Sequence, residues 1–374
     1  MAAGTEIAIV GGGLVGAAIG LGLVRGRANV ALYDEGDVAH RAARGNLGNV
    51  WVQGKGLASP PYAELTRRAA LAWRGFAAEL TDETGIDLRF RQDGAFFCCF
   101  SPEELDKRAG QLEAAEARSQ IPSGYARVGL SDMRADFPML GDDVAGATFS
   151  KLDGMVDPLR LLRALLAAFQ KRGGRYLPRA RVESIAPDAG GFRVASAAGL
   201  GHADRIVLAA GLGNARLAPQ LGLEALVRPV RGQILITEKL RPFMPRGISF
   251  IRQTADGGLI CGESSEEAGF EEATTRNVLQ DTARRATTVF PFLRDVRAVR
   301  AWGALRVMSP DGQPIYQGST DYPQAFLTSV HSGVTLAPFH AGPLADSIAA
   351  GALPDEIALP FSPSRFHVQA TRAA

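Results

Sequence analysis

The 374-residue sequence predicts a mixed α/β fold (α+β overall), because three stretches of the chain have distinct hydrophobic patterns. Residues 7–33 read as a buried strand, a helix of small residues and a second buried strand. Residues 205–213 read as another buried strand of the parallel type that runs into a glycine turn. From residue 227 onward, short strands alternate apolar and polar side chains. We therefore expect a parallel sheet built from separate parts of the chain, with an antiparallel sheet inserted between them.

The first strand and helix are joined by a glycine-rich run at residues 11–16 that follows the pattern G-x-G-x-x-G. In this pattern Gly11 permits a tight turn, Gly13 lets a pyrophosphate approach the backbone, and Gly16 lets the helix pack closely on the strand. The helix N-terminus favours negative charge. Asp34 ends the second strand, where a carboxylate can accept hydrogen bonds from ribose hydroxyls. The motif predicts a dinucleotide site, and alone it leaves NAD, NADP and FAD open.

Composition excludes several function classes. A hydrophobic fraction of 46%, a charged fraction of 21% and a net charge of +2 are typical of a globular enzyme and imply neither nucleic acid nor an anionic membrane as a partner. Cys98, Cys99 and Cys261 form no metal-binding pattern, so we expect no metal site and a reducing compartment. The first strand begins within six residues, which predicts a cytoplasmic protein without a signal peptide. Any membrane association is expected to occur through partners. The apolar helical stretch Leu161–Phe169 is too short to span a bilayer.

Between these landmarks the sequence predicts further elements in order. A helix is expected from Tyr62 to Thr84, and strands from Leu88 to Arg91 and from Gly94 to Phe100. Asp157 and Pro158 open a helix that Gly173 and Gly174 stop. A helix of small residues is expected to begin at Gly333 and to run to about Ala350.

The order of these elements predicts a discontinuous Rossmann-like domain. An NAD dehydrogenase usually completes its cofactor domain in one block, whereas here the nucleotide strands are widely separated. The order therefore favours an FAD-binding domain from residues 1–85, 150–225 and 308–374. An antiparallel-sheet substrate-binding domain is expected from residues 86–149 and 226–307.

Five motifs occur in this order: residues 11–16 with Asp34, then 203–211, 228–233, 303–312 and 331–338. In these motifs the chain resembles the D-amino acid oxidase-like FAD-dependent oxidoreductases, which include glycine oxidase, sarcosine oxidase and D-amino acid dehydrogenases. The segment 48–56 further resembles flavin subunits of multi-subunit dehydrogenases for D-hydroxyproline and opines, and of hydrogen cyanide synthase. That resemblance implies a second dehydrogenase subunit and a small iron–sulfur protein as partners. In some members of this superfamily, a cysteine in the late part of the chain holds the flavin covalently. The last cysteine of this chain is Cys261, inside the inserted sheet, so the resemblance implies non-covalently bound FAD.

The resemblance also implies catalytic residues for an amino-acid-like substrate. Arg306 is the first candidate for gripping the substrate carboxylate, since guanidinium binds carboxylate bidentately; a structural ion pair is the alternative. Arg252 is a second candidate. His331 is expected beside the flavin pyrimidine edge, where it could add positive charge or hydrogen-bond within its loop. Lys55 and Trp51 are expected to face the flavin or the substrate, although lysine is usually solvated and tryptophan usually packs in a core.

The resemblance and the glycine motif together imply a set of FAD-binding residues from several segments. They are Gly11, Gly13, Leu14, Val15, Gly16, Asp34, Glu35, Arg44, Gly45, Asn46, Leu47, Gly48, Asn49, Val182, Ala210, Gly211, His331, Ser332, Gly333, Val334 and Thr335.

The expected reaction is hydride transfer from the carbon alpha to an amine onto flavin N5, which gives an imine. The leading hypothesis is a dehydrogenase of a secondary-amine or D-configured amino acid, similar to D-hydroxyproline or an opine, within a hetero-oligomer. The alternatives are a stand-alone oxidase that uses O₂, a glycine-oxidising cyanide synthase subunit, a flavoprotein in which FAD only stabilises the fold, and an NAD-dependent dehydrogenase.

Overall fold

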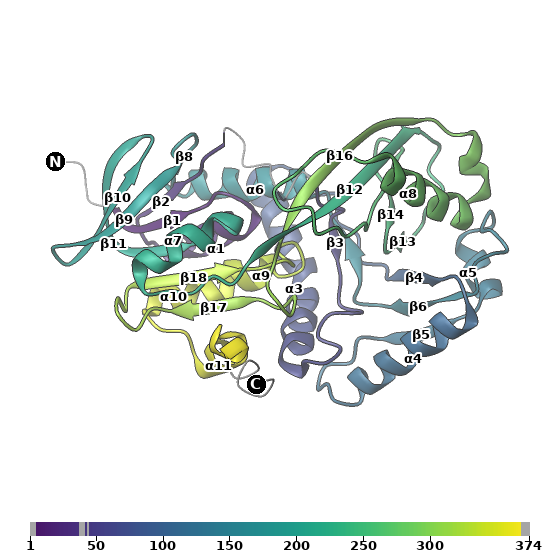
Figure 1. The fold of residues 1–374 in the computed structure, drawn as a ribbon, viewed down its shortest axis with the longest axis horizontal. Helices are drawn as coiled ribbons and strands as arrows, with labels where there is room; N and C mark the ends of the chain where they lie inside the picture. Colours follow the sequence, from purple (N-terminus) through teal and green to yellow (C-terminus); the bar gives the residue numbers. More distant parts are fainter. Residues whose placement is uncertain (1–4, 37–41, 43–44, 368–374) are drawn as a thin grey trace.

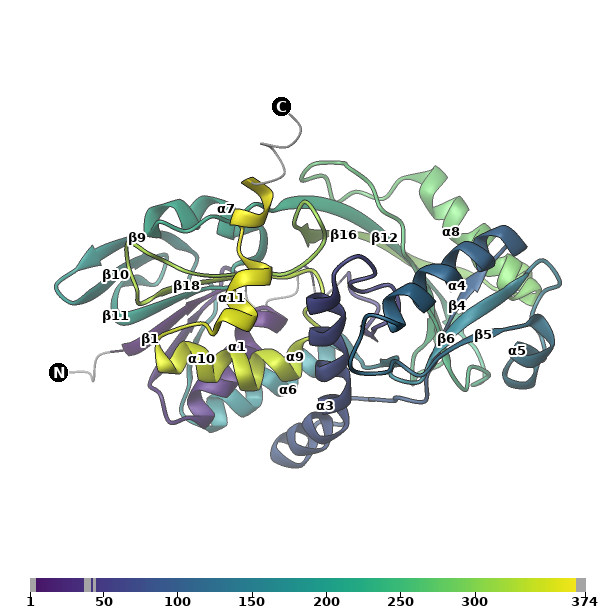
Figure 2. The same ribbon diagram turned by 90° about the horizontal axis from the view of Figure 1, so that it is seen from below.

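The computed structural model describes residues 5–36, 42 and 45–367 of the chain. In this part of the chain two eight-stranded sheets lie side by side (Figure 1). The long strands β12 (Arg228–Lys239) and β16 (Ala298–Met308) lead from the region between them into the second sheet. The helix α3 (Pro60–Thr84) also stands between the sheets (Figure 2). The short strands β3 (Asn49–Val50) and β7 (Gly154–Met155) pair with each other.

The first sheet has a parallel centre with strand order β18-β11-β1-β2-β8. Ile7 in the central strand lies opposite Val30 on one side and Arg205 on the other. Residues 7–10 are buried because both faces of the sheet are covered, one by the helices α1 (Leu14–Arg25) and α6 (Pro158–Lys171) and the other by β9, β10 and short helical segments. This burial explains their continuous apolar run. The strands are β1 (Thr5–Val10), β2 (Val30–Tyr33), β8 (Arg175–Leu177), β9 (Val182–Asp188), β10 (Gly191–Ser196), β11 (Gly199–Leu208), β17 (Ile315–Gly318) and β18 (Ala325–Ser329).

The helix α1 (Leu14–Arg25) packs between α6 (Pro158–Lys171) and the last helical segments of the chain. Asp157 caps α6 by accepting hydrogen bonds from the Leu159 and Arg160 backbone N–H groups at 3.0 and 3.1 Å, as its sequence predicts. The remaining helical segments near this sheet are η1 (Gly211–Gly213), α7 (Asn214–Leu217), η2 (Ala218–Leu221), α9 (Ala337–Phe339), η4 (His340–Leu344), α10 (Ala345–Ala350) and α11 (Asp355–Phe361).

The second sheet has the order β16-β12-β15-β14-β13-β4-β6-β5 and is antiparallel except between β13 and β4. Its core is aromatic: the ring of Phe137 lies 5.7 Å from those of both Phe96 and Phe290. Its other strands are β4 (Ala95–Cys99), β5 (Tyr125–Val128), β6 (Gly146–Ser150), β13 (Gly247–Ile248), β14 (Ile251–Gln253) and β15 (Gly258–Cys261). The helical segments here are α4 (Pro102–Glu116), α5 (Leu130–Asp136), α8 (Arg276–Val289) and η3 (Pro291–Asp295).

The structure corrects two of the elements expected from the sequence. Residues 88–91 are irregular and form a single bridge, from Arg91 to Met155, rather than a strand. The last helix begins at Ala337 instead of Gly333, with Pro338 in its first turn, where no backbone N–H is required. Its middle turn, η4, is a wide π turn that contains Pro343, which has no N–H to donate. The division into two domains by residue range remains a proposal.

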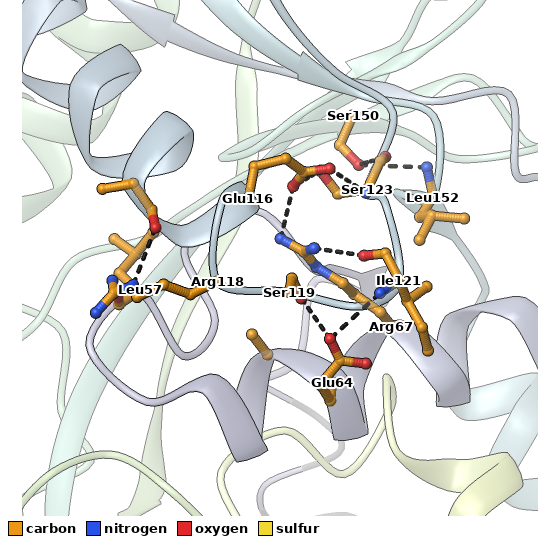
Figure 3. Close-up of polar contacts among 12 residues, drawn as sticks. Leu57, Glu64, Arg67, Glu116, Arg118, Ser119, Ile121, Ser123, Ser150 and Leu152 are labelled. Carbon is orange, nitrogen blue, oxygen red and sulfur yellow. Dashed lines mark hydrogen bonds and ion pairs between the residues drawn. The ribbon is translucent and has the colours of Figure 1, made fainter.

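An ion pair between Arg67 of α3 and Glu116, the last residue of α4, joins these two helices (Figure 3). Arg67, which is 4% exposed, lies 2.8 Å from the Glu116 carboxylate and donates to the Ile121 carbonyl oxygen. One turn earlier on α3, Glu64 accepts hydrogen bonds from the Ser119 hydroxyl at 2.6 Å and the Ile121 N–H at 3.3 Å. These contacts fix α4 against the helix that stands between the sheets.

Candidate active site

The glycine-rich run forms a close-packed turn between β1 and α1. Gly11 has a φ of +109°, and a Cβ added there would lie 2.4 Å from the Ala209 carbonyl oxygen. A Cβ added at Gly16 would lie 1.9 Å from the Gly11 carbonyl oxygen. The Ala17 N–H bonds back to Gly13, so the preceding amides of the first turn are available for a ligand. This geometry is that of an anion site at a helix N-terminus.

The acidic end of β2 holds this turn in place. Asp34 accepts a hydrogen bond from the Gly12 N–H at 2.7 Å through Oδ2 and one from the Gly36 N–H at 2.9 Å through Oδ1. Glu35 follows it, with its carboxylate 3.9 Å from the Arg181 Nε. Both acids line the cavity beside the glycine turn, at the position that the sequence predicts for ribose binding.

A cavity of about 490 Å³, the large cavity, runs from this turn to the loop after β18. The predicted cofactor residues that line it are Gly11, Gly13, Leu14, Val15, Asp34, Glu35, Asn46, Val182, Ala210, Gly211, His331 and Gly333. Gly16 and Gly48 do not line it and act by permitting close packing. Arg44 lies outside the described residues. The lining also includes Arg181 and Phe270, which the motifs did not indicate.

A second cavity of about 200 Å³, the small cavity, adjoins the far end of the large one. The residues that line both are Ala42, Asn46, Leu305, Val307, Val330 and His331. The small cavity alone is lined by Gly45, Leu47, Asn49, Trp51, Lys55, Gly232, Ile234, Glu263, Ala304, Arg306, Ser332, Val334 and Thr335. The structure thus brings segments 45–55 and 331–335 together with Arg306, as the resemblance implies.

Thr335 joins these two segments. Its hydroxyl accepts a hydrogen bond from the Trp51 N–H at 3.0 Å, and its carbonyl oxygen accepts one from Trp73 Nε1 at 3.0 Å. Asn49 is held in turn through its side-chain amide, which donates to the Ser249 carbonyl oxygen at 2.7 Å. The loop 331–335 and the segment 45–55 are therefore one rigid wall of the small cavity.

Lys55 and His331 lie on this wall, with Lys55 Nζ 3.4 Å from His331 Nδ1. Burial lowers the pKa of Lys55 to about 8, although the nearby Glu263 carboxylate opposes the change. The pKa of His331 lies well below its usual value because of burial and the positive charges of Lys55 and Arg306. His331 is therefore neutral near pH 7, which favours hydrogen bonding over a positive charge at this position.

Arg306 extends from β16 across β12. Its Nη1 donates to the Ser264 carbonyl oxygen at 2.7 Å and lies 3.4 Å from that of Arg231. The side chain passes directly over Gly232, where an added Cβ would lie 2.5 Å from Nη1. Arg306 forms no ion pair with any residue in the described ranges, so its charge is available to a ligand in the small cavity.

Glu263 is the acidic residue of the small cavity, and no sequence motif indicated it. It follows β15 with a φ of +75°, in the left-handed region that glycine normally occupies. Burial raises the pKa of its carboxyl group. No periodicity or spacing in the sequence indicates that this residue reaches the site, because its position depends on pairing between β12, β14 and β15.

A buried polar network supports the segment that carries Lys55. Asp153 accepts hydrogen bonds from the Val52 N–H at 2.6 Å and from Gln53 Nε2 at 2.7 Å. The Gln53 side-chain oxygen accepts from the Thr148 hydroxyl at 2.6 Å, and Arg108 Nε donates to that hydroxyl at 2.9 Å. Burial raises the pKa of Asp153 to about 7.

Arg252, the second carboxylate candidate, lines neither cavity. It is 6% exposed, and its Nη1 donates to the Val156 carbonyl oxygen at 3.2 Å. Because Arg252 lines neither cavity, it does not contribute to the candidate site.

Comparison with known proteins decides the family. The model of the FAD dependent oxidoreductase family matches residues 6–347. The chain belongs to this FAD-dependent oxidoreductase family. It is 41% identical over 365 residues to an opine oxidase subunit of Agrobacterium tumefaciens (strain Ach5), covering 97% of this chain and 98% of that protein. It is 40% identical over 366 residues to the corresponding opine oxidase subunit of Rhizobium meliloti, with the same coverage of 97% and 98%.

Among solved structures, glycine oxidase from Geobacillus kaustophilus has the same fold, with a TM-score of 0.88 at 24% identity over 96% of this chain and 97% of that chain. The expected resemblance, the α/β fold and FAD as cofactor are thereby confirmed. The chain is an FAD-dependent oxidoreductase that acts on amine donors. No helix within residues 5–36, 42 and 45–367 is both long and apolar enough to cross a membrane.

The large cavity fits FAD as the family requires. Gly13 lines it, and no heavy atom lies within 4 Å of a Cβ added there, so that a phosphate can approach the backbone. Asp34 and Glu35 line one end of the cavity, where the sequence predicts ribose binding, and His331 and Gly333 also line it. None of the three cysteines lines this cavity, and non-covalent attachment stays a prediction.

Proposed function

We propose that this FAD-dependent oxidoreductase oxidises opine-type substrates, which are secondary amines with a carboxylate on each side of the nitrogen. Its similarity to the two opine oxidase subunits over nearly the full length of each chain supports this substrate class. The observation that carries the proposal is the pair of cationic side chains, Arg306 and Lys55, on the walls of the small cavity. Two cations suit a substrate with two carboxylates.

When bound, FAD would supply the hydride acceptor for the substrate. The substrate loses a hydride from the carbon alpha to nitrogen, and its C–N single bond becomes a C=N bond. Water then cleaves this bond and gives a keto acid and a primary amino acid. The protein must therefore hold the substrate with this carbon facing the acceptor and with its nitrogen unprotonated.

Arg306 is proposed to grip the carboxylate next to the reacting carbon. One of its donors is engaged by the Ser264 carbonyl oxygen, which fixes the guanidinium plane, and the remaining donors can bind a carboxylate. Lys55 is proposed to hold the second carboxylate as a point charge. His331 accepts from Lys55 and orients it, and the loop 331–335 is proposed to contact the flavin ring.

The same relatives support a hetero-oligomer. Both are named as one subunit of an opine oxidase, so we propose that this chain is the flavin subunit of an assembly with a second dehydrogenase subunit and a small iron–sulfur subunit. In that arrangement electrons leave the flavin for a partner instead of O₂.

Anaerobic reduction of the FAD-loaded protein tests the substrate class without any partner, because only the first half-reaction is needed. We expect a dicarboxylic secondary amine such as an N-carboxyalkyl amino acid to bleach the flavin absorbance and to yield a keto acid. Glycine, sarcosine, D-alanine and D-hydroxyproline serve as comparison substrates. Faster reduction by any of these would replace the opine-type proposal, and rapid reoxidation by air would contradict the dehydrogenase assembly.

A further inference from the structure

The small cavity is lined by one acidic residue, Glu263, whose backbone conformation is unfavourable for a residue with a side chain. Glu263 has a φ of +75°, a conformation that costs free energy for a residue with a Cβ. Such strained residues persist only where the surrounding structure holds them, and they concentrate at functional sites. The neighbours of Glu263 show how it is held.

Both flanks of Glu263 are anchored. The Gly262 N–H donates to the Phe250 carbonyl oxygen at 3.0 Å, and the Ser264 hydroxyl accepts from the Gln233 N–H at 2.7 Å. Arg306 adds its 2.7 Å hydrogen bond to the Ser264 carbonyl oxygen. The chain is therefore fixed immediately before and after Glu263, and its side chain lies in the wall of the small cavity.

The Glu263 carboxylate is also electrostatically unusual. It forms no ion pair within the described part of the chain. The positive charges of Arg285, Arg306 and Arg108 nevertheless favour its ionised form, and its negative charge favours the protonated form of Lys55. Burial has the opposite effect and raises the pKa of Glu263. An acid that is partly buried beside cations, without forming an ion pair with any of them, is suited to a cationic ligand.

The charges around the small cavity form a pattern of two cations and one anion. Arg306 and Lys55 supply the cations, Glu263 supplies the anion, and His331 is neutral. The complementary ligand carries two carboxylates and one positively charged nitrogen. This is the charge pattern of a secondary ammonium group between two carboxylates.

We propose that Glu263 binds the secondary ammonium group of the substrate and accepts its proton before the hydride leaves the neighbouring carbon. This inference rests on the proposed function and assigns the residue that recognises its amine. In the transfer the N–H bond breaks, its electron pair remains on nitrogen, and an O–H bond forms on the Glu263 carboxylate. The nitrogen lone pair then becomes available to form the C=N bond. The raised pKa supports this role, because it brings the carboxylate closer to the basicity of an amine.

Two matched probes test the binding part on the FAD-loaded protein. Iminobis(2-methylpropanoate) carries two carboxylates and an ammonium group, and it has no hydrogen on either α-carbon to lose. Oxybis(2-methylpropanoate) replaces the ammonium with an ether oxygen. We expect the wild type to bind the ammonium probe about tenfold or more tightly than the ether, measured by perturbation of the flavin spectrum, since a buried charged hydrogen bond is lost.

Glu263→Gln keeps the size and backbone strain of the residue and removes its charge. In this variant the affinities for the ammonium probe and the ether probe should lie within about twofold of each other. The control Glu267→Gln, an exposed change four residues further on, should preserve the wild-type ratio of these two affinities. An unchanged ratio in Glu263→Gln would overturn the inference. Failure of the wild type to bind either probe would instead overturn the proposed substrate class together with this inference.

Flavin reduction at saturating substrate tests the proton transfer. We expect Glu263→Gln to lower the limiting rate constant at pH 7 by about tenfold or more, and to shift the rise of this rate to higher pH, where the substrate is already deprotonated. A limiting rate and pH profile equal to those of the wild type would exclude Glu263 as the proton acceptor, even if the probe affinities changed.

Discussion

Lys55 Nζ and His331 Nδ1 lie 3.4 Å apart, although 276 residues separate them in the chain. Protonated lysine has only donors, so neutral His331 must accept at Nδ1 and carry its proton on Nε2. The contact links the segment beside β3 to the loop before α9, and it places one positive charge at a defined point in the small cavity.

This charge gives ligand binding a pH dependence. Because the pKa of Lys55 is lowered to about 8, its charge is lost as pH rises through 8 and not near its usual value. We expect the affinity for the ether probe to fall by up to roughly tenfold between pH 7 and pH 9. Lys55→Met should bind weakly at both values and show no such fall, and the exposed change Lys151→Met should behave as wild type. A fall that persists in Lys55→Met would assign the titration to another group.

Asp153 gives stability a pH dependence of known sign. Its folded pKa is raised by burial to about 7, above the usual value of 3.8. The folded state therefore binds the proton of Asp153 more tightly than the unfolded state does. The resulting contribution to the free energy of unfolding is fully present below about pH 4 and is lost as pH rises through 7. We expect it to amount to a few kcal/mol.

The Asp153→Asn variant, which cannot ionise, isolates this contribution. The wild-type melting temperature, measured relative to that of the variant, should fall between pH 4 and pH 7. The exposed change Asp142→Asn serves as the control and should leave the wild-type profile in place. A parallel profile for Asp153→Asn and wild type would show that Asp153 is ionised throughout.

The ion pair between Arg67 and Glu116 is expected to contribute to stability because Arg67 is buried, although Glu116 is 27% exposed. Arg67→Ala leaves the Glu116 carboxylate and the Ile121 carbonyl oxygen without this partner. We expect urea unfolding to show a loss of about 1–3 kcal/mol in the free energy of unfolding. Arg68→Ala, an exposed change one residue further along α3, should stay within about 0.5 kcal/mol of the wild type. Similar losses of unfolding free energy in both variants would show that the effect comes from the helix propensity of the α3 residues and not from the ion pair.

Gly232 is expected to be required for the position of Arg306. A methyl group there would lie 2.5 Å from the guanidinium, which can move because it ends a flexible side chain. Gly232→Ala should therefore fold normally but bind substrate about tenfold or more weakly, since the bidentate grip is displaced. In Gly258→Ala the nearest heavy atom would be 3.4 Å away, so this β15 variant is the control. Unchanged substrate affinity in Gly232→Ala would remove Arg306 from the proposed site.

Two glycines of the turn after β1 should respond differently to alanine. Gly13→Ala adds a methyl group to open space in the large cavity, so the apoprotein should melt normally while FAD binds weakly. Gly16→Ala would place Cβ 1.9 Å from the Gly11 carbonyl oxygen and should lower the melting temperature of the apoprotein itself. Melting of both apoproteins, followed by FAD titration, distinguishes the two effects. Equal apoprotein stability would contradict the packing role of Gly16.

The parts of the fold that could be predicted are those whose signal is local. The turn at residues 11–16, the cap at Asp157 and the apolar strands all depend on neighbours within a few positions. The irregular conformation of residues 88–91 was not predicted, because only Arg91 finds a pairing partner, Met155, which is distant in the sequence. The start of the last helix at Ala337 was not predicted either; it places Pro338 in the first turn, where no backbone N–H is required.

The sequence by itself was enough to predict the dinucleotide turn and the acid at the end of the second strand, because each of these features depends on residues close in sequence. It also predicted that the nucleotide-binding strands are widely separated along the chain, because each strand has its own local apolar pattern. Only the tertiary structure brought Lys55, Glu263, Arg306 and His331 to one cavity and excluded Arg252 from it. Their meeting depends on strand register and loop packing over hundreds of residues. Burial there also sets their protonation, which no sequence pattern encodes.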